Sequence, residues 1–541
     1  MNDFEKSTNA ADSSTALPWI FSYVLLLFIF SGISLGFIRG AQLAAFYIPL
    51  SILLTLRLNS LLKKILFIVN VGFCLIVSSF CGIQGFLYEN YEASIDSSFV
   101  VEALANTNID EAVSYIKAGL EELLIWGLSF FSVFFFCTIC LTKIAQLNIP
   151  RSKKYLIFIA VLAFIFIFSF YQDSWRKKFP LFVYVGLFNA VNTQQDYWRD
   201  IEKENKRYLL AAKNLVSSVA EDPKTIVLII GESTSREDMS LYGYSRNTTP
   251  RLKEIEVKDP LFIKTNEAYS TRFSTVSAFN SMLEFDINKP SGEHVHLLAL
   301  FKEAGYHITW ISNQDDLGIE AEYSSFADNL VKMNRQPGRS SMSFDEKVIP
   351  ELKNALSQNY RKKLIVVHLI GLHPHFALRF PKGTKATWNK DDDVSRFLKE
   401  MGRSQRTLIL KEQYNLGMLY QDKIISETLL ITKDATKNTP CDWIYLSDHG
   451  AESGNRGDFV GHSSKTLGGY TIPFLFWSNK KNLAQKRELL INRPFRADWL
   501  SFLLLDLAGI KCKFSFDNKS WLDQDYRWSE PEIITSLKTK K

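Results

Sequence analysis

Long apolar segments in the first 171 residues constrain this 541-residue chain more than any other feature. A helix needs about 20 consecutive, mainly apolar residues to cross the hydrocarbon core of a bilayer. Five segments reach or approach that length: residues 18–38, 41–58, 65–87, 121–142 and 155–171. The first has no small-residue cleavage site after it, so we expect a retained helix and not a cleaved signal peptide. The sequence therefore predicts a transmembrane domain of five helices over residues 1–171.

The charges between these segments predict how the chain is oriented. Lysine and arginine in short loops favour the cytoplasmic side. Two such loops are basic, with Arg57, Lys63, Lys64, Lys143, Arg151, Lys153 and Lys154. The loop at 88–120 is mainly acidic. The N-terminus is thus expected in the cytoplasm and the long C-terminal part outside it, although a basic run at 176–178 on the outer side mildly opposes this orientation.

The rest of the chain has the pattern of a soluble α/β protein. Residues 172–222 are polar and helical in pattern, and we expect them to bridge to a soluble domain at 223–541. Short apolar runs there alternate with amphipathic helices, which is typical of a largely parallel sheet with both faces covered. The predicted strands include residues 225–231, 307–312, 363–371 and 442–448. Ligands of such sheets bind beyond the carboxyl ends of the strands.

Composition narrows the classes of function. All eight histidines lie in the soluble part, which places any metal chemistry there. The net charge is only +6, and no basic stripe of the kind that nucleic-acid binding requires is present. Cys441 and Cys512 are the only cysteines of the soluble part, and the sequence leaves open whether they pair.

Candidate metal ligands follow several predicted strands. Glu232 follows the strand at 225–231, and Asp448 and His449 end or follow the strand at 442–448. His373 follows a third strand, and His462 lies a little further along the chain. Carboxylate and imidazole groups are ligands that zinc prefers. Each residue alone is weak support, but together they predict a metal site at this edge of the sheet.

A candidate nucleophile precedes an amphipathic helix. Thr275 directly precedes apolar residues spaced at helical intervals, so it is expected at a helix N-terminus, where backbone N–H groups favour phosphate. A plain N-cap role for Ser274 or Thr275 is the alternative. A threonine hydroxyl becomes nucleophilic only when a metal or a base removes its proton.

Several long motifs carry a resemblance to a known family. They are GESTSREDMSLYGYSRNTTP at 231–250, GLHPHFALRFP at 371–381, YNLGMLYQD at 414–422, and SDHGAESG at 447–454 followed by GH at 461–462. With these motifs, the chain resembles the phosphoethanolamine transferases of Gram-negative envelopes, within the alkaline phosphatase and sulfatase superfamily. The resemblance covers nearly the whole chain and implies an alkaline phosphatase/sulfatase-like domain that faces the periplasm.

The resemblance implies a role for each candidate residue. Glu232, Asp448 and His449 would bind the catalytic zinc, and Thr275 would complete that site and carry the covalent intermediate. The spacing of Thr275 to Phe285 resembles that of the family, and Ser274 is the second choice for the nucleophile. The other two histidines would hold the substrate phosphate or a second zinc, or assist proton transfer; they are His373 and His462.

A stretch of the acidic loop also resembles the family. In ALANTNIDEA at 103–112, Thr107 and Glu111 match residues near the ethanolamine headgroup, although a solvated helix start is the alternative. Ala103 replaces a family asparagine, and Leu317 and Gly318 occupy the stretch in which a lysine is often found. These departures weaken the case for lipid A as the acceptor and leave the lipopolysaccharide core as a second candidate.

The predicted function is transfer of phosphoethanolamine from phosphatidylethanolamine to a lipopolysaccharide component, in the inner membrane, through a zinc-assisted threonine intermediate. A phosphoglycerol transferase shares the topology and the threonine, and is the main alternative. The sulfatase C/S-x-P-x-R setting is absent around Thr275. A non-catalytic envelope-binding protein and a transporter are further alternatives, of which the transporter has little support because no span holds a clear buried ionisable residue.

Overall fold

The computed structural model describes residues 13–91, 93–106, 120–147, 153–287, 293–314, 319, 322–333, 343–480, 483–516 and 518–539. It divides into two compact units. Following the predictions above, residues 1–101 and 119–193 are called the membrane unit, and residues 102–118 and 194–541 are called the catalytic unit.

Apolar helices occupy all five predicted segments of the membrane unit. They are α1 (Ser13–Leu35), α2 (Phe37–Leu53), α3 (Ser60–Tyr91), α6 (Leu120–Gln146) and α7 (Lys153–Tyr171). Three of them, α1, α3 and α6, are long and apolar enough to cross a membrane, whereas α2 and the apolar part of α7 are shorter. At 1.5 Å per residue, the 17 residues of α2 extend about 25 Å, less than the roughly 30 Å of a bilayer core. A crossing by all five helices therefore stays a prediction.

The segment between the apolar helices and the sheet is mainly helical, as expected. It contains α8 (Asp173–Arg176) and the long helix α9 (Pro180–Leu215), along which the chain passes from one unit to the other. Residues 216–219 differ from the prediction, because they form strand β1 and pair with β15 (Ile510–Cys512). The short helix α4 (Ser98–Asn106) lies in the acidic loop and contributes its second half to the catalytic unit.

A seven-stranded sheet forms the centre of the catalytic unit. In spatial order its strands are β3 (Phe262–Lys264), β13 (Phe474–Ser478), β10 (Cys441–Ser447), β2 (Lys224–Gly231), β9 (Lys362–His368), β7 (His307–Ser312) and β8 (Asn329–Lys332). The strands from β10 to β8 are parallel to one another, whereas β13 runs antiparallel to both its neighbours. The four predicted strands are confirmed as the parallel centre of the sheet.

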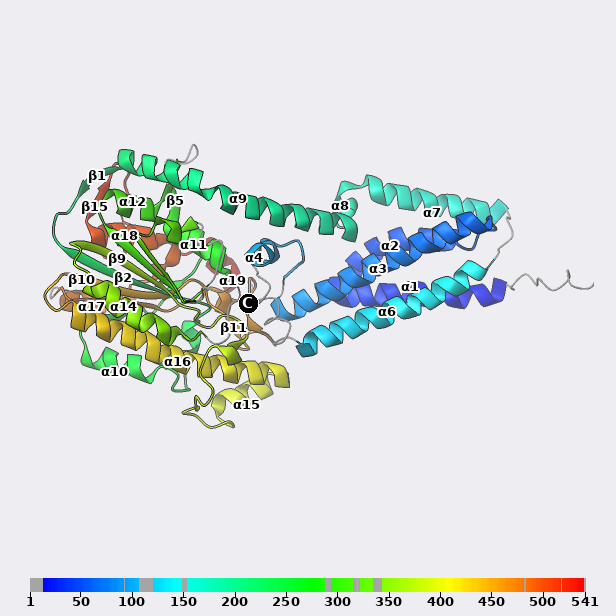
Figure 1. Ribbon diagram of the computed structural model, residues 1–541. Helices are drawn as coiled ribbons and strands as arrows, with labels where there is room; N and C mark the ends of the chain where they lie inside the picture. Colours follow the sequence, from blue (N-terminus) through cyan, green and yellow to red (C-terminus); the bar gives the residue numbers. More distant parts are fainter. Residues whose placement is uncertain are drawn as a thin grey trace, which may run out of the picture. The chain divides into compact units, whose positions relative to one another are not determined.

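Side chains alternate along β2 and join two separate cores. Ile226, Leu228 and Ile230 pack into one hydrophobic cluster, and Val227 and Ile229 pack into the other. The first cluster is covered by α11 (Thr275–Leu283), α12 (Leu297–Glu303) and α18 (Leu500–Ala508). The second is covered by α10 (Pro250–Lys258), α14 (Val348–Ser357) and α16 (Gln405–Ala435). Because β2 is buried on both faces, its sequence is a nearly continuous apolar run. With helices on both faces of the sheet, the catalytic unit has three layers (Figure 1).

Short strand pairs and helices complete the catalytic unit. The pairs are β4 (Ala268–Tyr269) with β14 (Phe495–Arg496), β5 (Glu284–Ile287) with β6 (Glu293–His296), and β11 (Glu452–Ser453) with β12 (Val460–Gly461). The helices are α15 (Asp393–Glu400), α17 (Leu483–Asn492) and α19 (Glu532–Thr539). Cys441 and Cys512, whose pairing the sequence left open, are free thiols on β10 and β15.

Candidate active site

The candidate site forms where neighbouring parallel strands end. Glu232 directly follows β2, and Asp448 and His449 directly follow β10, which pairs with β2. Strand β9 pairs with β2 on its other side and leads into the loop that carries His373. The hairpin of β11 and β12 places His462 one residue after β12. Residues from three of the long motifs thus converge beyond the sheet.

The turn after β2 holds Glu232 in a buried position. Ser233 adopts φ 54°, a left-handed conformation that costs free energy in a residue other than glycine. Its N–H donates to Asp448 Oδ1 at 3.2 Å, and its hydroxyl donates to Glu232 Oε1 at 2.7 Å. Tyr414 of α16 secures the turn, since its hydroxyl donates to the Ser233 carbonyl at 2.8 Å and accepts from the Ser235 N–H at 2.9 Å.

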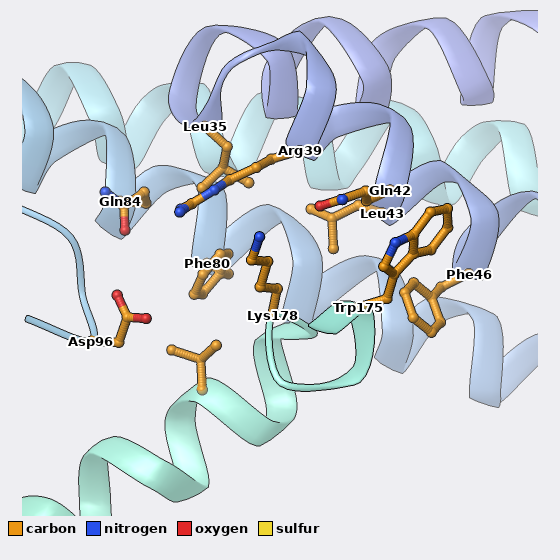
Figure 2. Close-up of a pocket in the computed structure, with 11 residues that line it drawn as sticks. Leu35, Arg39, Gln42, Leu43, Phe46, Phe80, Gln84, Asp96, Trp175 and Lys178 are labelled. Carbon is orange, nitrogen blue, oxygen red and sulfur yellow. The ribbon is translucent and has the colours of Figure 1, made fainter. Parts of the chain in front are cut away.

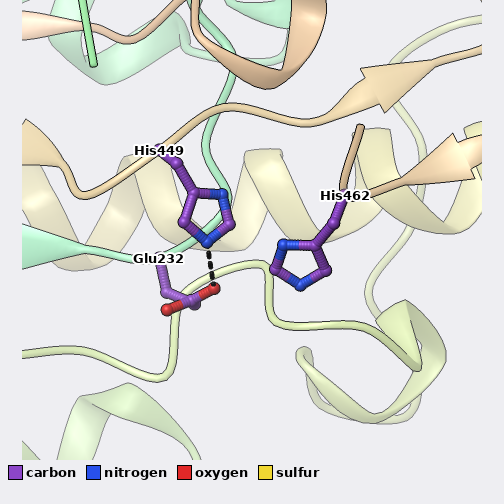
Figure 3. A group of neighbouring side chains, drawn as sticks. All are labelled: Glu232, His449 and His462. Carbon is purple, nitrogen blue, oxygen red and sulfur yellow. Dashed lines mark ion pairs between the residues drawn. The ribbon is translucent and has the colours of Figure 1, made fainter. Parts of the chain in front are cut away.

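Two imidazoles present the same nitrogen to the site. Nδ1 of His449 lies 2.8 Å from the carbonyl oxygen of Gly450, and Nδ1 of His462 lies 3.2 Å from that of Phe273. A carbonyl oxygen only accepts, so Nδ1 carries the proton in each ring and Nε2 is left as a ligand atom. The two rings are neighbours, with centroids 4.6 Å apart, and Figure 3 shows both beside the carboxylate of Glu232.

These residues fit a metal ion. Ligand atoms of Glu232, His449 and His462 all lie within 4.8 Å of one another, and the three residues are buried. Nε2 of His449 lies 3.3 Å from Glu232 Oε1 and 3.4 Å from Asp448 Oδ2. Among the described residues, that nitrogen and Asp448 Oδ2 are both buried without a hydrogen-bond partner. Buried polar atoms without a partner are costly, and a cation between them would satisfy both.

The electrostatics of the cluster lead to the same conclusion. Burial disfavours the charge of Glu232, but the attraction of His449, His373 and His462 outweighs it and holds the pKa of Glu232 well below its usual range. Burial and the neighbouring Glu232 charge raise the pKa of Asp448 well above its usual range. Burial lowers the pKa of His449, yet Asp448 and Glu232 together raise it to about 9. The carboxylates thus require a positive charge at this position, which a divalent cation would supply.

The hydrogen bonds of Thr275 and Ser274, the two candidate nucleophiles, differ. Thr275 is the first residue of α11, and its hydroxyl donates to Glu232 Oε2 at 3.0 Å. Ser274 occupies the N-cap position, but its side chain makes no capping hydrogen bond. Its hydroxyl donates instead to Glu102 Oε2 at 3.2 Å. We call Glu232, Asp448, His449 and His462 the metal-type cluster. Of the two hydroxyls, that of Thr275 contacts this cluster.

His373 lies next to the same cluster. Its ring centroid is 6.4 Å from that of His462. Arg379 holds the loop that carries it, because its guanidinium donates to the carbonyl oxygens of His373 and Pro374, each at 3.1 Å. The predicted pair of additional histidines is therefore brought together beside Glu232 and His449.

Some predicted site residues lie outside the described part of the chain, and some contributors were missed. Thr107, Glu111, Leu317 and Gly318 lie outside the described residues. Glu102 was missed, although it directly precedes the stretch at 103–112 that resembles the family. Burial raises the pKa of the Glu102 carboxyl, while Ser274 and Arg272 favour its charged form. Its hydrogen bond to Ser274 places an acidic group beside the residue that precedes Thr275.

Asp345 is a second residue that the sequence did not indicate. Its buried carboxylate accepts from the N–H groups of Ile370 at 2.9 Å and Gly371 at 3.0 Å, and from Gln421 Nε2 at 2.8 Å. These bonds fix the loop after β9 against Glu232, whose carbonyl oxygen accepts from the N–H of Leu372 at 2.9 Å. The only sequence signal was indirect: Gly371 and Gln421 belong to two of the long motifs.

Comparison with known proteins agrees with this geometry. The sulfatase family profile matches residues 224–510, which is more than half of the chain. The chain belongs to the sulfatase family. It is 25% identical over 445 residues to the phosphoethanolamine transferase EptC of Escherichia coli (strain K12), covering 76% of this chain and 75% of that protein. The resemblance to phosphoethanolamine transferases is thereby confirmed.

Two solved structures have a similar fold. The C-terminal periplasmic domain of E. coli EptC in complex with Zn has a TM-score of 0.54 and 28% identity, covering 59% of this chain and 91% of that one. The integral membrane protein lipooligosaccharide phosphoethanolamine transferase A from Neisseria meningitidis has a TM-score of 0.58 at 16% identity, covering 95% of this chain and 97% of that one. The fold similarity thus extends over the apolar helices as well as the sulfatase domain.

Proposed function

We propose that this chain transfers phosphoethanolamine from phosphatidylethanolamine to a lipopolysaccharide component through a covalent intermediate on Thr275. The observation that carries the proposal is the 3.0 Å hydrogen bond from the Thr275 hydroxyl to Glu232, a member of the buried metal-type cluster. A hydroxyl in contact with such a cluster is suited to attack an electrophile. Similarity to EptC supports phosphoethanolamine as the group transferred.

Zinc is the proposed metal, because the ligand set is two carboxylates, an imidazole and the nucleophile. Glu232, Asp448, His449 and Thr275 would hold it, and His373 and His462 would hold the donor phosphate or a second ion. When bound, zinc would lower the pKa of the threonine hydroxyl and neutralise charge on the phosphoryl oxygens. The related EptC domain was solved in complex with Zn, which supports the choice of metal.

The proposed reaction has two displacement steps. First, Thr275 Oγ1 attacks the phosphorus of the donor phosphodiester, a Thr275–phosphorus bond forms, and the bond to the diacylglycerol oxygen breaks. The proton that Thr275 gives up must reach the leaving oxygen, and His373 and His462 are the candidate carriers. In the second step an acceptor oxygen attacks the same phosphorus, and Thr275 leaves and regains its proton. The protein contributes mainly positioning and charge neutralisation, as is general for phosphoryl transfer.

A headgroup ammonium would require a negative partner near the nucleophile. Glu102 lies one hydrogen bond from Ser274, the neighbour of Thr275, and is half-buried. We propose that Glu102 supplies this counter-charge, together with the predicted headgroup residues Thr107 and Glu111. An acidic side chain at this position favours an ethanolamine headgroup over an uncharged glycerol headgroup.

The proposed location is the inner membrane of a Gram-negative bacterium, with the N-terminus in the cytoplasm and the catalytic unit in the periplasm. Donor and acceptor are then both lipids at the outer face of the same bilayer. The acceptor is a core sugar or lipid A, and the similarity to a lipooligosaccharide phosphoethanolamine transferase in fold is consistent with either.

The test is transfer of label from the donor to the protein. Full-length, zinc-loaded protein would be incubated in nanodiscs with headgroup-labelled phosphatidylethanolamine, and its peptides analysed by mass spectrometry. We expect label on Thr275 with release of diacylglycerol. Thr275→Ala should lose label and reduce turnover at least about a thousand-fold, as in other enzymes that lose a nucleophile. Ser274→Ala is the matched control and should retain label.

Other outcomes would contradict specific parts of the proposal. Label from phosphatidylglycerol but not from phosphatidylethanolamine would identify a phosphoglycerol transferase. Label on Ser274 would move the nucleophile by one residue. No label on any residue of zinc-loaded protein, with no diacylglycerol released, would contradict the covalent mechanism.

A further inference from the structure

A pocket in the membrane unit combines charged and apolar walls. It lies where α1 ends and α2 begins, near the end of α3, and between α8 and the start of α9. Because successive apolar helices run in opposite directions, these positions all lie at the same end of the helix bundle. Figure 2 shows the side chains of Arg39, Lys178 and Asp96 directed toward this space. The predicted orientation places this end at the outer, periplasmic side of the bilayer.

Two cations of the pocket have no ion-pair or side-chain hydrogen-bond partner in the part of the chain that the structure describes. Among the described residues, no ion pair or hydrogen bond engages the charged group of Arg39 or Lys178. The two basic residues before Lys178 differ, because Arg176 and Lys177 both pair with Asp173, at 2.5 and 2.6 Å. Within the run 176–178, which opposes the expected orientation, only Lys178 lines the pocket. Lysine and arginine in short loops usually lie on the cytoplasmic side, so these two on the outer side are exceptions. Binding of an anionic ligand would explain why they are there.

The carboxylate of the pocket is held in place by a buried amide. Gln84 of α3 donates through Nε2 to the Ala93 carbonyl at 3.1 Å and accepts from the Ile95 N–H at 3.0 Å. These bonds fix the turn that immediately precedes Asp96. The exposed Asp96 carboxylate is therefore positioned on the same pocket as the two cations.

The deeper wall is apolar. Phe46 and Phe80 line it and are 1% and 5% exposed. Trp175 lines the same pocket, and tryptophan is enriched where a membrane meets water. A ligand of this pocket must combine an anion, a cation and an apolar body at the bilayer surface, and a glycerophospholipid with an amine headgroup has all three.

We propose that this pocket binds the headgroup of a phosphatidylethanolamine-type lipid, with the phosphate between Arg39 and Lys178 and the ammonium at Asp96. Choosing this lipid rests on the proposed function, in which it is the donor. The binding itself requires no transfer chemistry. The pocket would hold the donor lipid at the membrane unit, by contacts that do not involve the metal-type cluster.

The experiment measures binding in a protein that cannot turn over. Full-length Thr275→Ala protein would be placed in phosphatidylcholine nanodiscs containing a photoactivatable phosphatidylethanolamine, and cross-linked peptides would be mapped. We expect labelled peptides at 35–46 or 175–183. Arg39→Gln or Lys178→Gln should each weaken that labelling about fivefold, the effect of removing roughly one cation near a lipid phosphate. Lys177→Gln is the matched control and should label like the parent protein.

Competition then tests the headgroup. Unlabelled phosphatidylethanolamine should compete better than phosphatidylglycerol, and Asp96→Asn should remove that preference while keeping the labelling. Equal labelling of the parent and the Arg39→Gln/Lys178→Gln double variant would overturn the proposal that this pocket binds the lipid phosphate. Stronger competition by phosphatidylglycerol would overturn the ammonium assignment. Since every arm uses the Thr275→Ala protein and measures only binding, failure of this proposal is distinct from failure of the transfer mechanism.

Discussion

At the scale of single residues, the hydrogen bonds of neighbouring hydroxyls distinguish their roles. Thr275 and Ser274 are adjacent, yet one contacts Glu232 and the other contacts Glu102. The first contact joins the proposed nucleophile to the metal-type cluster. The second contact places a carboxylate next to Ser274, where the proposed function requires a partner for the headgroup ammonium.

The role of Glu102 can be tested by donor discrimination. We expect Glu102→Gln to raise the KM for phosphatidylethanolamine roughly tenfold, because a hydrogen bond to a charged group is worth about 1.5–3 kcal/mol. Turnover at saturation should fall less. The measurement is kcat/KM for phosphatidylethanolamine relative to phosphatidylglycerol. An unchanged ratio in Glu102→Gln would assign this residue a purely structural role.

Gly371 is a residue whose replacement should damage the site by contact. It has φ +52°, and a Cβ there would lie 2.7 Å from both the nitrogen and the oxygen of Glu232. Gly371→Ala must therefore displace Glu232, and we expect loss of bound zinc and a lower melting temperature. Gly305→Ala is the control, since Gly305 has φ +74° and a Cβ there would have no neighbour within 4 Å. This variant should lower the free energy of unfolding by only about 1–2 kcal/mol. Equal zinc content in the two variants would contradict the contact argument.

At the scale of elements, α16 connects the sheet to the loop that follows β2. Lys411 of α16 forms an ion pair with Asp238 and donates to Ser453 Oγ at 2.8 Å, and Ser453 Oγ donates to Asp238 Oδ2 at 2.6 Å. Lys411 and Asp238 are both buried. Tyr414 lies one helical turn further on and holds the Ser233 turn. One face of a single helix thus supports the whole segment from 233 to 238.

Breaking this buried ion pair should destabilise the catalytic unit. Lys411→Met leaves Asp238 buried without a counter-charge. We expect the free energy of unfolding to fall by about 3–5 kcal/mol, which a lower melting temperature would report. The double variant Lys411→Met/Asp238→Asn should recover much of that loss. Lys399→Met is the control, because Lys399 is exposed where it pairs with Asp391 at 3.1 Å and should cost under about 1 kcal/mol. A similar loss in Lys399→Met and Lys411→Met would show that burial is not the cause.

At the scale of the whole molecule, the two units are built for different solvents. The membrane unit exposes many large apolar side chains, among them Ile38 at 82% and Ile157 at 65%. Contiguous apolar surface of this kind needs an apolar environment. The catalytic unit instead buries its apolar residues in one cluster on each face of the sheet.

The number of crossings is a prediction at this scale. If α2 crosses the membrane, Asn59 lies in the cytoplasm and Ser94 lies outside. In a Cys512→Ser background, Ser94→Cys in intact spheroplasts should react with a membrane-impermeant maleimide, and Asn59→Cys should react only after permeabilisation. Labelling of Asn59→Cys from outside would show that α2 does not cross.

The sequence by itself determined the features that depend on local pattern. Apolar runs of bilayer length, the buried strands of the parallel sheet, and acidic or histidine residues at strand ends are all set by neighbouring residues. Motifs such as that at 231–250 were sufficient for the resemblance to phosphoethanolamine transferases, which the comparisons confirm. The strand at 216–219 was missed because its partner, β15, lies almost 300 residues later.

Only the tertiary structure decided which groups meet. Thr275 and Glu232 are 43 positions apart, and no local pattern states that the hydroxyl of Thr275 and not of Ser274 reaches the carboxylate. The orientation of His449 and His462 depends on backbone carbonyls that accept from Nδ1. The contact of Glu102 with Ser274 and the pocket lined by Arg39 and Lys178 likewise arise from elements far apart in the chain. Side-chain direction and loop closure determine such contacts, and both follow from packing and not from the order of residues.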